Sequence, residues 1–421
     1  MLETRLHELV HTLREGAEHA AEEAAILLQR EFDEHAEPVF GALRRFDPVV
    51  ANRLFAVVTR HADVTEVLAD HQTFSVRENG VRMRRLAGPF ILGEDDTELY
   101  RRHDAALRRV VRSEDLPRLR DHVFERAGRI LDERAREGAV DIVAQYADPV
   151  LADVSGFYLG APGPDEATQA RWAKAIFHEL FINVTNVASV RERAEEASEQ
   201  LRGHLEQVIA ARKRAVGGGK DDVLRRLLAL SEPPRLDDRE IRDNLVGLIT
   251  GWIPTASKAL AMAMMELLER PDALEQARAA AMEGDDARVR DHVWEALRFR
   301  PQNSGLLRYC EQDRIIARGT HRETTIRKGS TVFVATQSAM MDPEVVQDPR
   351  TYRPGRPPEC YMHFGQGLHR CWGEFINEVQ LPAMAAQLLR RPGLRHARGE
   401  RGRLRWDGPY PGRLVLEFDD A

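Results

Sequence analysis

The segment Phe364–Gly373, which reads Phe-Gly-Gln-Gly-Leu-His-Arg-Cys-Trp-Gly, has the strongest capacity for chemistry in the chain. Its two glycines, Gly365 and Gly367, allow the backbone to turn tightly and to approach a flat ligand closely. Cys371 comes just before a predicted helix, whose free N–H groups and dipole would stabilise a thiolate. A thiolate in a shielded, hydrogen-bonded loop is a suitable ligand for iron, and His369 would place a donor near it.

Two other interpretations of this loop remain open. A single cysteine such as Cys371 is most often an inert, buried residue. Alternatively, Cys360 and His363 together with His369 and Cys371 would give four ligands for zinc, although a Cys-x-His spacing this short fits zinc knuckles poorly. Cys310 and Cys360 are otherwise expected to be ordinary cysteines.

The composition excludes several classes of protein. The chain has 421 residues and a net charge of -7, which argues against a general nucleic-acid binder. Three cysteines are too few for a disulfide scaffold and suit a reducing compartment, so we expect a cytoplasmic protein. The N-terminus, Met1–Arg5, has no apolar region of the kind found in secretory signals, so we expect no membrane anchor.

Hydrophobic spacing predicts a mainly α fold with a small β portion. Helical patterns cover the first 35 residues, 62–68, 97–215 with a break near Gly160–Pro164, Arg239–Arg270 and Gly373–Leu389. Strand patterns occur at Leu54–Val58, Leu306–Tyr309, Ser330–Val334 and Arg413–Leu416, and irregular segments are expected at Gly80–Gly93 and Asp348–Pro358. We therefore expect one large domain over residues 1–421, with an N-terminal helical extension over residues 1–45.

The predicted helix Arg239–Arg270 is apolar nearly all round between Leu245 and Leu268, as in a buried core helix or a membrane span. Pro254 and Lys258 interrupt the apolar run, and no other segment resembles a span, so the core helix is favoured. Pro254 has no backbone donor and should kink the helix, freeing a carbonyl one turn earlier.

The cysteine loop resembles the ligand signature of the cytochrome P450 family, Phe-Gly-x-Gly-x-His-x-Cys-x-Gly, at every defined position. Glu295-Ala296-Leu297-Arg298 resembles the family's Glu-x-x-Arg, whose two charged side chains share one helix face. Arg356, in the Pro-rich run, matches the third member of that structural ion-pair network. The likeness extends from about Phe46 to Phe418 and implies a soluble haem-thiolate protein of the bacterial type.

The resemblance also assigns residues to a haem b cofactor (heme b, iron protoporphyrin IX). Cys371 would be the axial ligand and the only metal ligand from the chain. Arg308 and His369 match residues that bind the haem propionates, which is plausible because a cation beside a carboxylate forms a charge-assisted hydrogen bond. Further candidates for cofactor contacts, two of them with imperfect spacing, are His103, Arg108, Phe364 and Gly365.

The central helix departs from the family pattern. Most members carry an acid–alcohol pair there, which delivers protons to the dioxygen that the haem activates. The corresponding segment in this chain is Thr250-Gly251-Trp252-Ile253-Pro254-Thr255. Gly251 fits the pattern, but Ile253 occupies the acid position and Pro254 the alcohol position, and neither side chain can donate a proton.

Several explanations of this departure remain open. Thr255 could supply the hydroxyl if the proline kink rotates the helix. A peroxide would make the relay dispensable, and the family's peroxygenases carry a Pro in this region, although they have an Arg where this chain has Ile253. The substrate itself or a chain of waters could also supply the proton, or the protein could be a non-catalytic haem protein. The turn Trp372–Asn377 also departs from the common Leu-Ala-Arg form, without a mechanistic interpretation.

The resemblance implies an oxidoreductase that oxidises a lipophilic small molecule by monooxygenase chemistry, with Gly251, Pro254 and Thr255 beside the reaction. No flavin or iron–sulfur motif is present, so electrons would come from a ferredoxin-type partner docking near Arg298–Arg300 and Arg370. The alternative is a peroxide-driven peroxygenase or hydroperoxide isomerase, which needs no partner. A remote alternative is a non-enzymatic haem or zinc protein. Neither nucleic acid nor membrane is expected as a partner.

Overall fold

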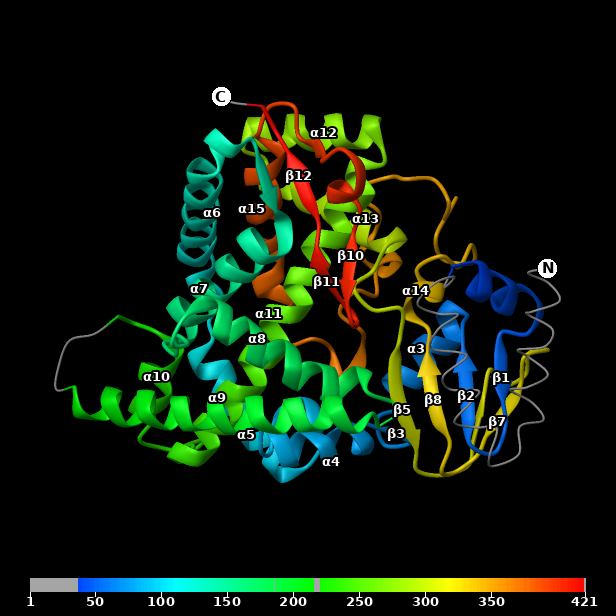
Figure 1. Ribbon diagram of the computed structural model, residues 1–421. Coiled ribbons are helices and arrows are strands. Elements are labelled where there is room, and N and C mark those ends of the chain that lie inside the picture. Colours follow the sequence, from blue (N-terminus) through cyan, green and yellow to red (C-terminus); the bar gives the residue numbers. More distant parts are fainter. Residues whose placement is uncertain (1–36, 185, 216–219, 420–421) are drawn as a thin grey trace. The chain divides into compact units, whose positions relative to one another are not determined.

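The computed structural model describes residues 37–184, 186–215 and 220–419, and these fall into two compact units. The sheet unit comprises residues up to Val81 with 92–96 and 303–372, and the helical unit comprises 82–91, 97–302 and 373–421 (Figure 1). Residues 37–46 are helical, whereas the helix predicted for the first 35 residues lies outside the described residues. The mainly α fold with a small β portion is confirmed, and the domain boundaries 1–421 and 1–45 stay a prediction.

The sheet unit is built on a five-stranded sheet with the strand order β1-β2-β8-β5-β3. Strands β2 and β8 are parallel and the other neighbours are antiparallel, with Arg308 of β5 opposite Val332 of β8. Its core contains Val58, Leu68 and Phe74. The elements are β1 (Val49–Ala51), β2 (Phe55–Val58), α3 (His61–Ala69), β3 (Phe74–Ser75), β5 (Leu306–Cys310), β6 (Arg314–Ile316), β7 (Thr324–Ile326), β8 (Thr331–Val334) and α14 (Thr336–Ala339).

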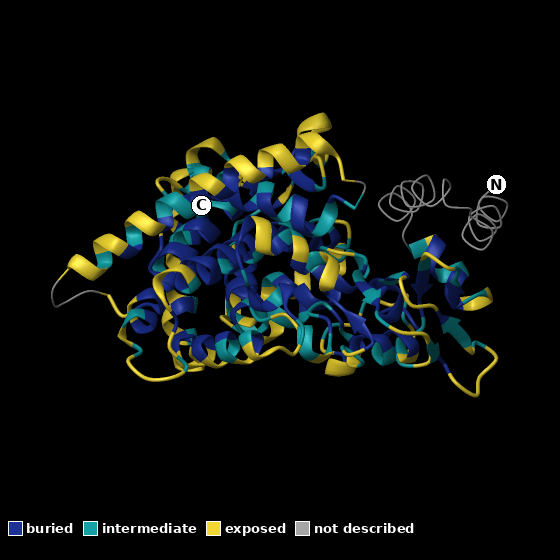
Figure 2. Ribbon diagram, turned by 90° about the horizontal axis from the view of Figure 1, so that it is seen from below, coloured by how far each residue is buried: buried dark blue, intermediate teal, exposed yellow. Residues whose placement is uncertain are grey.

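The helical unit packs around one long helix, α11, which contacts α7, α8, α9, α13 and α15. Buried residues lie on the faces where these helices pack together, and exposed residues lie on the faces toward solvent (Figure 2). The helices are α5 (Glu98–Val110), α6 (Leu116–Glu133), α7 (Asp148–Leu159), α8 (Glu166–Phe177), α9 (Ala188–Arg214), α10 (Val223–Ala229), α11 (Asp238–Leu268), α12 (Pro271–Glu283), α13 (Asp286–Phe299) and α15 (Glu374–Leu389). The strands are β4 (Ala139–Asp141), β9 (Arg395–His396), β10 (Arg405–Asp407), β11 (Tyr410–Arg413) and β12 (Val415–Glu417).

Helix α11 confirms the predicted central helix. It begins at a capping box in which Asp237 and Glu240 each accept a bond from the other's backbone N–H, and it continues through Pro254 without ending. By length and composition α11 could cross a membrane, but 78% of its apolar window is buried inside the protein. That burial identifies a core helix.

The prediction of an irregular loop at Gly80–Gly93 is wrong. Helix α4 covers Arg77–Leu86, and a 3-10 turn follows at Ile91–Gly93. The sequence hid this helix because it is rich in arginine and lacks an apolar repeat. Gly80 is required for packing, since an added Cβ would lie 2.3 Å from the carbonyl oxygen of Gly93.

Candidate functional site

The cysteine loop, residues 364–372 of the sheet unit, closes on itself through backbone hydrogen bonds. The Cys371 N–H donates to the Phe364 carbonyl at 2.8 Å, and the Arg370 N–H donates to the Gly367 carbonyl at 3.2 Å. Gly367 has φ +73°, and an added Cβ would lie 2.3 Å from the carbonyl oxygen of Leu68. Glycine is therefore required there, and the closed loop leaves Cys371 exposed.

The exposure of Cys371 decides between the interpretations of the loop. An inert, buried cysteine is wrong for this residue, whereas Cys310 and Cys360 are both buried. Burial raises the pKa of the Cys310 thiol to about 11, so that thiol is unreactive. Within the described residues, no three His, Cys, Asp or Glu side chains are grouped closely enough to hold a metal ion, so the zinc alternative at Cys360 and His363 is not formed.

Arg308 gives the sheet unit a buried cation. Burial lowers the pKa of its guanidinium to about 10, although the charge of Asp95 acts in the opposite direction. Its Nη1 donates to the carbonyl of Leu307 at 2.8 Å, and among the described residues no carboxylate oxygen lies within 4 Å of it. A buried cation of this kind would be stabilised by an anionic ligand such as a haem carboxylate.

His369 lies in the same unit and is held by Asp95. Its Nε2 is 3.1 Å from Asp95 Oδ1, and Asp95 also accepts a hydrogen bond from the backbone N–H of Val76 at 3.1 Å. Burial lowers the pKa of His369, the bond to Asp95 raises it, and Arg308 lowers it further. Asp95 therefore fixes the histidine ring, a role that the sequence did not reveal because an Asp within an acidic run carries no motif.

The segment of α11 that departs from the family pattern lies in the helical unit. An added Cβ at Gly251 would meet no atom within 4 Å, so Gly251 leaves open space beside the helix. Ile253 and Pro254 are both buried. The Thr255 hydroxyl donates to the carbonyl of Gly251 at 2.6 Å and lies 3.2 Å from that of Trp252. The hydroxyl of Thr255, the residue after Pro254, is therefore bonded to the backbone of its own helix.

Glu295 and Arg298 form a fully buried ion pair on α13, as the Glu-x-x-Arg resemblance predicts. Two hydrogen bonds of 2.8 and 3.0 Å join them, and neither side chain is exposed. Arg356 of the sheet unit donates to the carbonyls of Gln347, Asp348 and Thr351, and so holds the Pro-rich run. Because Arg298 is buried and paired, it cannot provide surface charge for a docking partner, contrary to the expectation.

Two predicted cofactor contacts lie on α5 of the helical unit. The side chain of Arg108 is 65% exposed, and its Nε is 2.7 Å from Asp104. His103 is buried, with Nδ1 3.0 Å from Asn244 Nδ2 and Nε2 3.5 Å from Glu240, so it is not a solvated surface residue. Burial lowers the pKa of His103. Their roles at the cofactor stay predictions.

Within the sheet unit, an exposed cysteine in a closed glycine loop and a buried cation near a held histidine fit a haem. Together with the mainly helical fold they define the class of haem-thiolate proteins.

Comparison with known proteins agrees. A family model described as Cytochrome P450 matches residues 167–400, more than half of the chain. Nocardicin C N-oxygenase of Nocardia uniformis subsp. tsuyamanensis is 28% identical, over 86% of this chain and 89% of that protein. Mycinamicin IV hydroxylase/epoxidase of Micromonospora griseorubida is 28% identical, over 83% and 85%. The crystal structure of CalO2 matches with a TM-score of 0.80 and 24% identity, over 93% of this chain and 97% of that one.

The chain belongs to the cytochrome P450 family. It is an oxidoreductase with monooxygenase-type chemistry that uses the family's protoporphyrin IX haem, and the peroxide-driven alternative is not favoured.

Proposed function

We propose that this chain inserts oxygen into a lipophilic small molecule at a haem held by Cys371. When bound, the haem supplies the iron at which dioxygen is activated. The observation that carries the proposal is the closed loop that exposes Cys371 and lies in the same unit as the buried Arg308. The Cys371 thiolate would ligate the iron, and Arg308 and His369 would bind the haem carboxylates. Phe364 and Gly365 would shape the loop next to the ring.

The chain's own residues divide the remaining work. Gly251 would leave room for the ring and the reacting oxygen, because nothing fills the space where its Cβ would be. Thr255 would deliver or orient a proton once its hydroxyl releases the carbonyl of Gly251, and Pro254 would loosen the helix at that point. His103 and Arg108 would contact the cofactor from α5.

The substrate is proposed to be a lipophilic small molecule. Two relatives are named for the oxidation of nocardicin C and mycinamicin IV. In the helical unit, the rings of Phe177 and Phe181 lie 4.7 Å apart at the end of α8 and offer an apolar surface for such a molecule.

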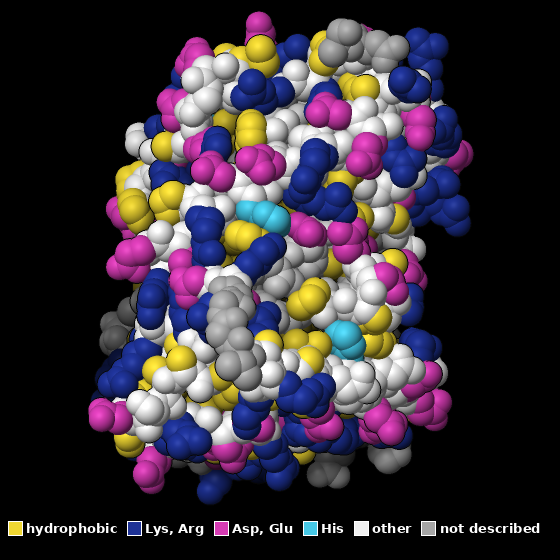
Figure 3. Space-filling model, turned by 90° about the vertical axis from the view of Figure 1, so that its left-hand side faces the viewer, with side chains coloured by type: hydrophobic (Ala, Val, Ile, Leu, Met, Phe, Trp, Pro, Cys, Tyr) yellow, Lys and Arg dark blue, Asp and Glu magenta, His cyan; other side chains and the backbone are white. Residues whose placement is uncertain are grey.

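Electrons are proposed to come from a separate ferredoxin-type protein, in the cytoplasm. The sequence carries no flavin or iron–sulfur motif of its own. On the face shown in Figure 3, Lys and Arg side chains lie among Asp and Glu side chains.

One spectrum tests the proposal. The purified, haem-loaded protein is reduced and exposed to carbon monoxide, and a thiolate ligand should give the strongly red-shifted Soret band of the family. Cys371→His should bind haem but give an ordinary band, whereas Cys310→Ser should keep the red-shifted band. An ordinary band in the unsubstituted protein would overturn the assignment of Cys371.

A further inference from the structure

Two buried side chains, Trp252 and Gln380, and the half-buried Asn377 connect α11 to the beginning of α15 within the helical unit. Trp252 Nε1 donates to Gln380 Oε1 at 2.9 Å, Gln380 Nε2 donates to Asn377 Oδ1 at 2.7 Å, and Asn377 Nδ2 donates to the Gly373 carbonyl at 3.0 Å. Gln380 is 1% exposed and Trp252 8% exposed. The bond between Trp252 and Gln380 joins two buried groups, so breaking it leaves a buried donor or acceptor without its partner, which is costly. We call these three residues the indole–amide bridge.

The bridge begins near the point where Pro254 removes one backbone hydrogen bond from α11. Trp252 lies two residues before Pro254, whose missing N–H leaves the carbonyl of Thr250 without its usual intrahelical partner. Thr255 bonds back to its own helix at the same turn, an arrangement that bends helices. The indole therefore ties the interrupted turn of α11 to a neighbouring helix.

The bridge ends at the first turn of α15. Gly373 is the N-cap residue of α15, and no side-chain hydrogen bond caps this end. Its carbonyl receives both the backbone N–H and the side-chain amide of Asn377, each at 3.0 Å. The Asn377 side chain therefore adds a second hydrogen bond to the carbonyl of Gly373, the residue that follows Cys371 by two positions in the chain.

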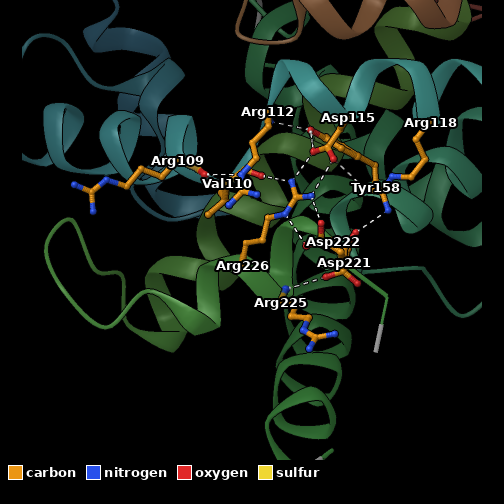
Figure 4. A network of polar contacts seen from close by, with 10 residues as sticks. All are labelled: Arg109, Val110, Arg112, Asp115, Arg118, Tyr158, Asp221, Asp222, Arg225 and Arg226. Atoms are coloured by element: carbon orange, nitrogen blue, oxygen red, sulfur yellow. Dashed lines mark hydrogen bonds and ion pairs between the residues drawn. The ribbon is translucent and has the colours of Figure 1, made fainter. Parts of the chain in front are cut away.

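The Trp252 ring lies next to Tyr158, whose hydroxyl is bonded to a charged cluster. The rings of Trp252 and Tyr158 are 6.2 Å apart and tilted by 59°. The Tyr158 hydroxyl donates to Asp115 at 3.1 Å, and Asp115 binds the guanidinium of Arg226 at 2.5 and 2.9 Å (Figure 4). Arg226 is itself 8% exposed, so Tyr158 connects the indole to a buried charged network.

We propose that Trp252, Gln380 and Asn377 are positioning residues that hold the turn after Cys371 and thereby keep the thiolate bound to iron. The inference rests on the proposed role of Cys371 as the haem ligand. They act through the backbone of Gly373. The bridge also joins the turn of α11 around Pro254 to the first turn of α15. The two segments that depart from the family pattern, 250–255 and 372–377, are therefore connected by hydrogen bonds.

Three substitutions in the full-length, haem-loaded protein test the bridge. Trp252→Phe removes the indole donor, Gln380→Met removes both amide links, and Asn377→Ala removes the last link alone. Trp172→Phe is the matched control, because Trp172 Nε1 makes the same kind of bond to Gln200 Oε1 at 2.7 Å between α8 and α9. Two quantities are measured: the rate at which the red-shifted carbon monoxide band converts to the ordinary band, and amide hydrogen exchange of residues 374–377.

The bridge predicts that all three substitutions accelerate both rates about tenfold or more at temperatures well below unfolding. Asn377→Ala should leave the exchange of residues 250–253 unchanged, whereas Gln380→Met should accelerate it. Trp172→Phe should alter neither rate beyond its effect on the melting temperature. Unchanged rates in Trp252→Phe and Gln380→Met, or band loss that only follows the melting temperature, would overturn the proposal. If the unsubstituted protein lacks the red-shifted band, the role of Cys371 fails, and the exchange rates still decide whether the bridge holds α15.

Discussion

The hydroxyl of Thr255 donates a hydrogen bond to the carbonyl oxygen of Gly251, 2.6 Å away and one turn earlier in α11. The proton that the family expects from an alcohol is therefore directed into the helix. Neither Ile253 nor Pro254 can replace it, since both side chains are apolar and buried. If Thr255 supplies the proton, as proposed, dioxygen chemistry in this chain depends on how readily its hydroxyl leaves that carbonyl.

Thr255→Val keeps the branched shape of the side chain and removes the hydroxyl. We expect product formation with dioxygen and reduced ferredoxin to fall by about tenfold or more, because a positioned proton donor typically contributes at least that much. Turnover with hydrogen peroxide, which brings its own protons, should change by less than about threefold. Thr255→Ser is the control and should retain most of the dioxygen activity. Equal losses with both oxidants would show that Thr255 acts by shape alone.

The double change Ile253→Glu, Pro254→Thr restores the acid–alcohol pair. If proton delivery limits the reaction, dioxygen consumption coupled to product should rise several-fold, measured with an oxygen electrode and product analysis. Pro254→Ala separates the backbone from the chemistry, since it returns an N–H to the helix without adding a proton donor. It should raise the melting temperature and leave coupling unchanged. A coupled rate that stays flat in the double variant would place the relay elsewhere.

Arg308→Met should have opposite effects on the haem-free and haem-loaded protein. The pKa of Arg308 falls from 12.5 to about 10 on burial, which at about 1.4 kcal/mol per pKa unit corresponds to at most about 3 kcal/mol of cost in the haem-free chain at neutral pH. Removing the charge should therefore stabilise the haem-free chain toward urea, and this gain should shrink above pH 10, where the folded arginine loses its proton. Haem affinity should fall at least about tenfold, because the proposed cationic partner of a haem carboxylate is removed. Arg314→Met, which removes a partly exposed cation paired with Asp70, should change neither quantity appreciably.

Glu240 makes the stability of the helical unit depend on pH. Its hydrogen bond with Arg102 lowers the pKa of the Glu240 carboxyl from 4.5 to about 2, and the backbone N–H of Asp237 adds to the effect. A lowered carboxyl pKa stabilises the fold fully above pH 4.5, and this contribution is lost as the pH falls toward 2. Glu240→Gln should therefore cost about 1 kcal/mol at pH 7, after screening by solvent, and almost nothing near pH 2.

Urea titrations at pH 7, 4 and 3 measure this difference. Glu400→Gln is the control, since the pair of Glu400 with Arg403 is exposed and should have little effect at any pH. A cost for Glu240→Gln that is the same at pH 7 and pH 3 would contradict the assignment.

The sequence predicted the elements whose pattern is local. The apolar run around Pro254 predicted a buried central helix, and the spacing of Gly365, Gly367 and Cys371 predicted a closed loop with a thiol before a helix. Helix α4 was missed because arginines give no apolar period, and Gly80 was taken for a loop signal when it serves close packing.

Residues that act through distant partners left no signal in the sequence. Asp95 is 274 positions from His369 and Trp252 is 128 positions from Gln380, and no periodicity relates such pairs. Arg298 was instead given a role that it does not have. The sequence suggested a surface charge, whereas the fold buries Arg298 in an ion pair with Glu295.

Glu295 and Arg298 provide a test of the buried ion pair on α13. Glu295→Gln leaves a guanidinium without its counter-charge in a position that is 0% exposed, which typically costs about 3–5 kcal/mol. We expect this variant to show a much lower unfolding midpoint in urea and to retain little haem. Glu295→Met combined with Arg298→Met removes both charges and should recover much of the lost stability, because a buried pair replaced by apolar side chains is often neutral. If the single and double variants are equally unstable, the pair acts through bonds to other groups, and its mutual charge compensation is not what holds α13 in place.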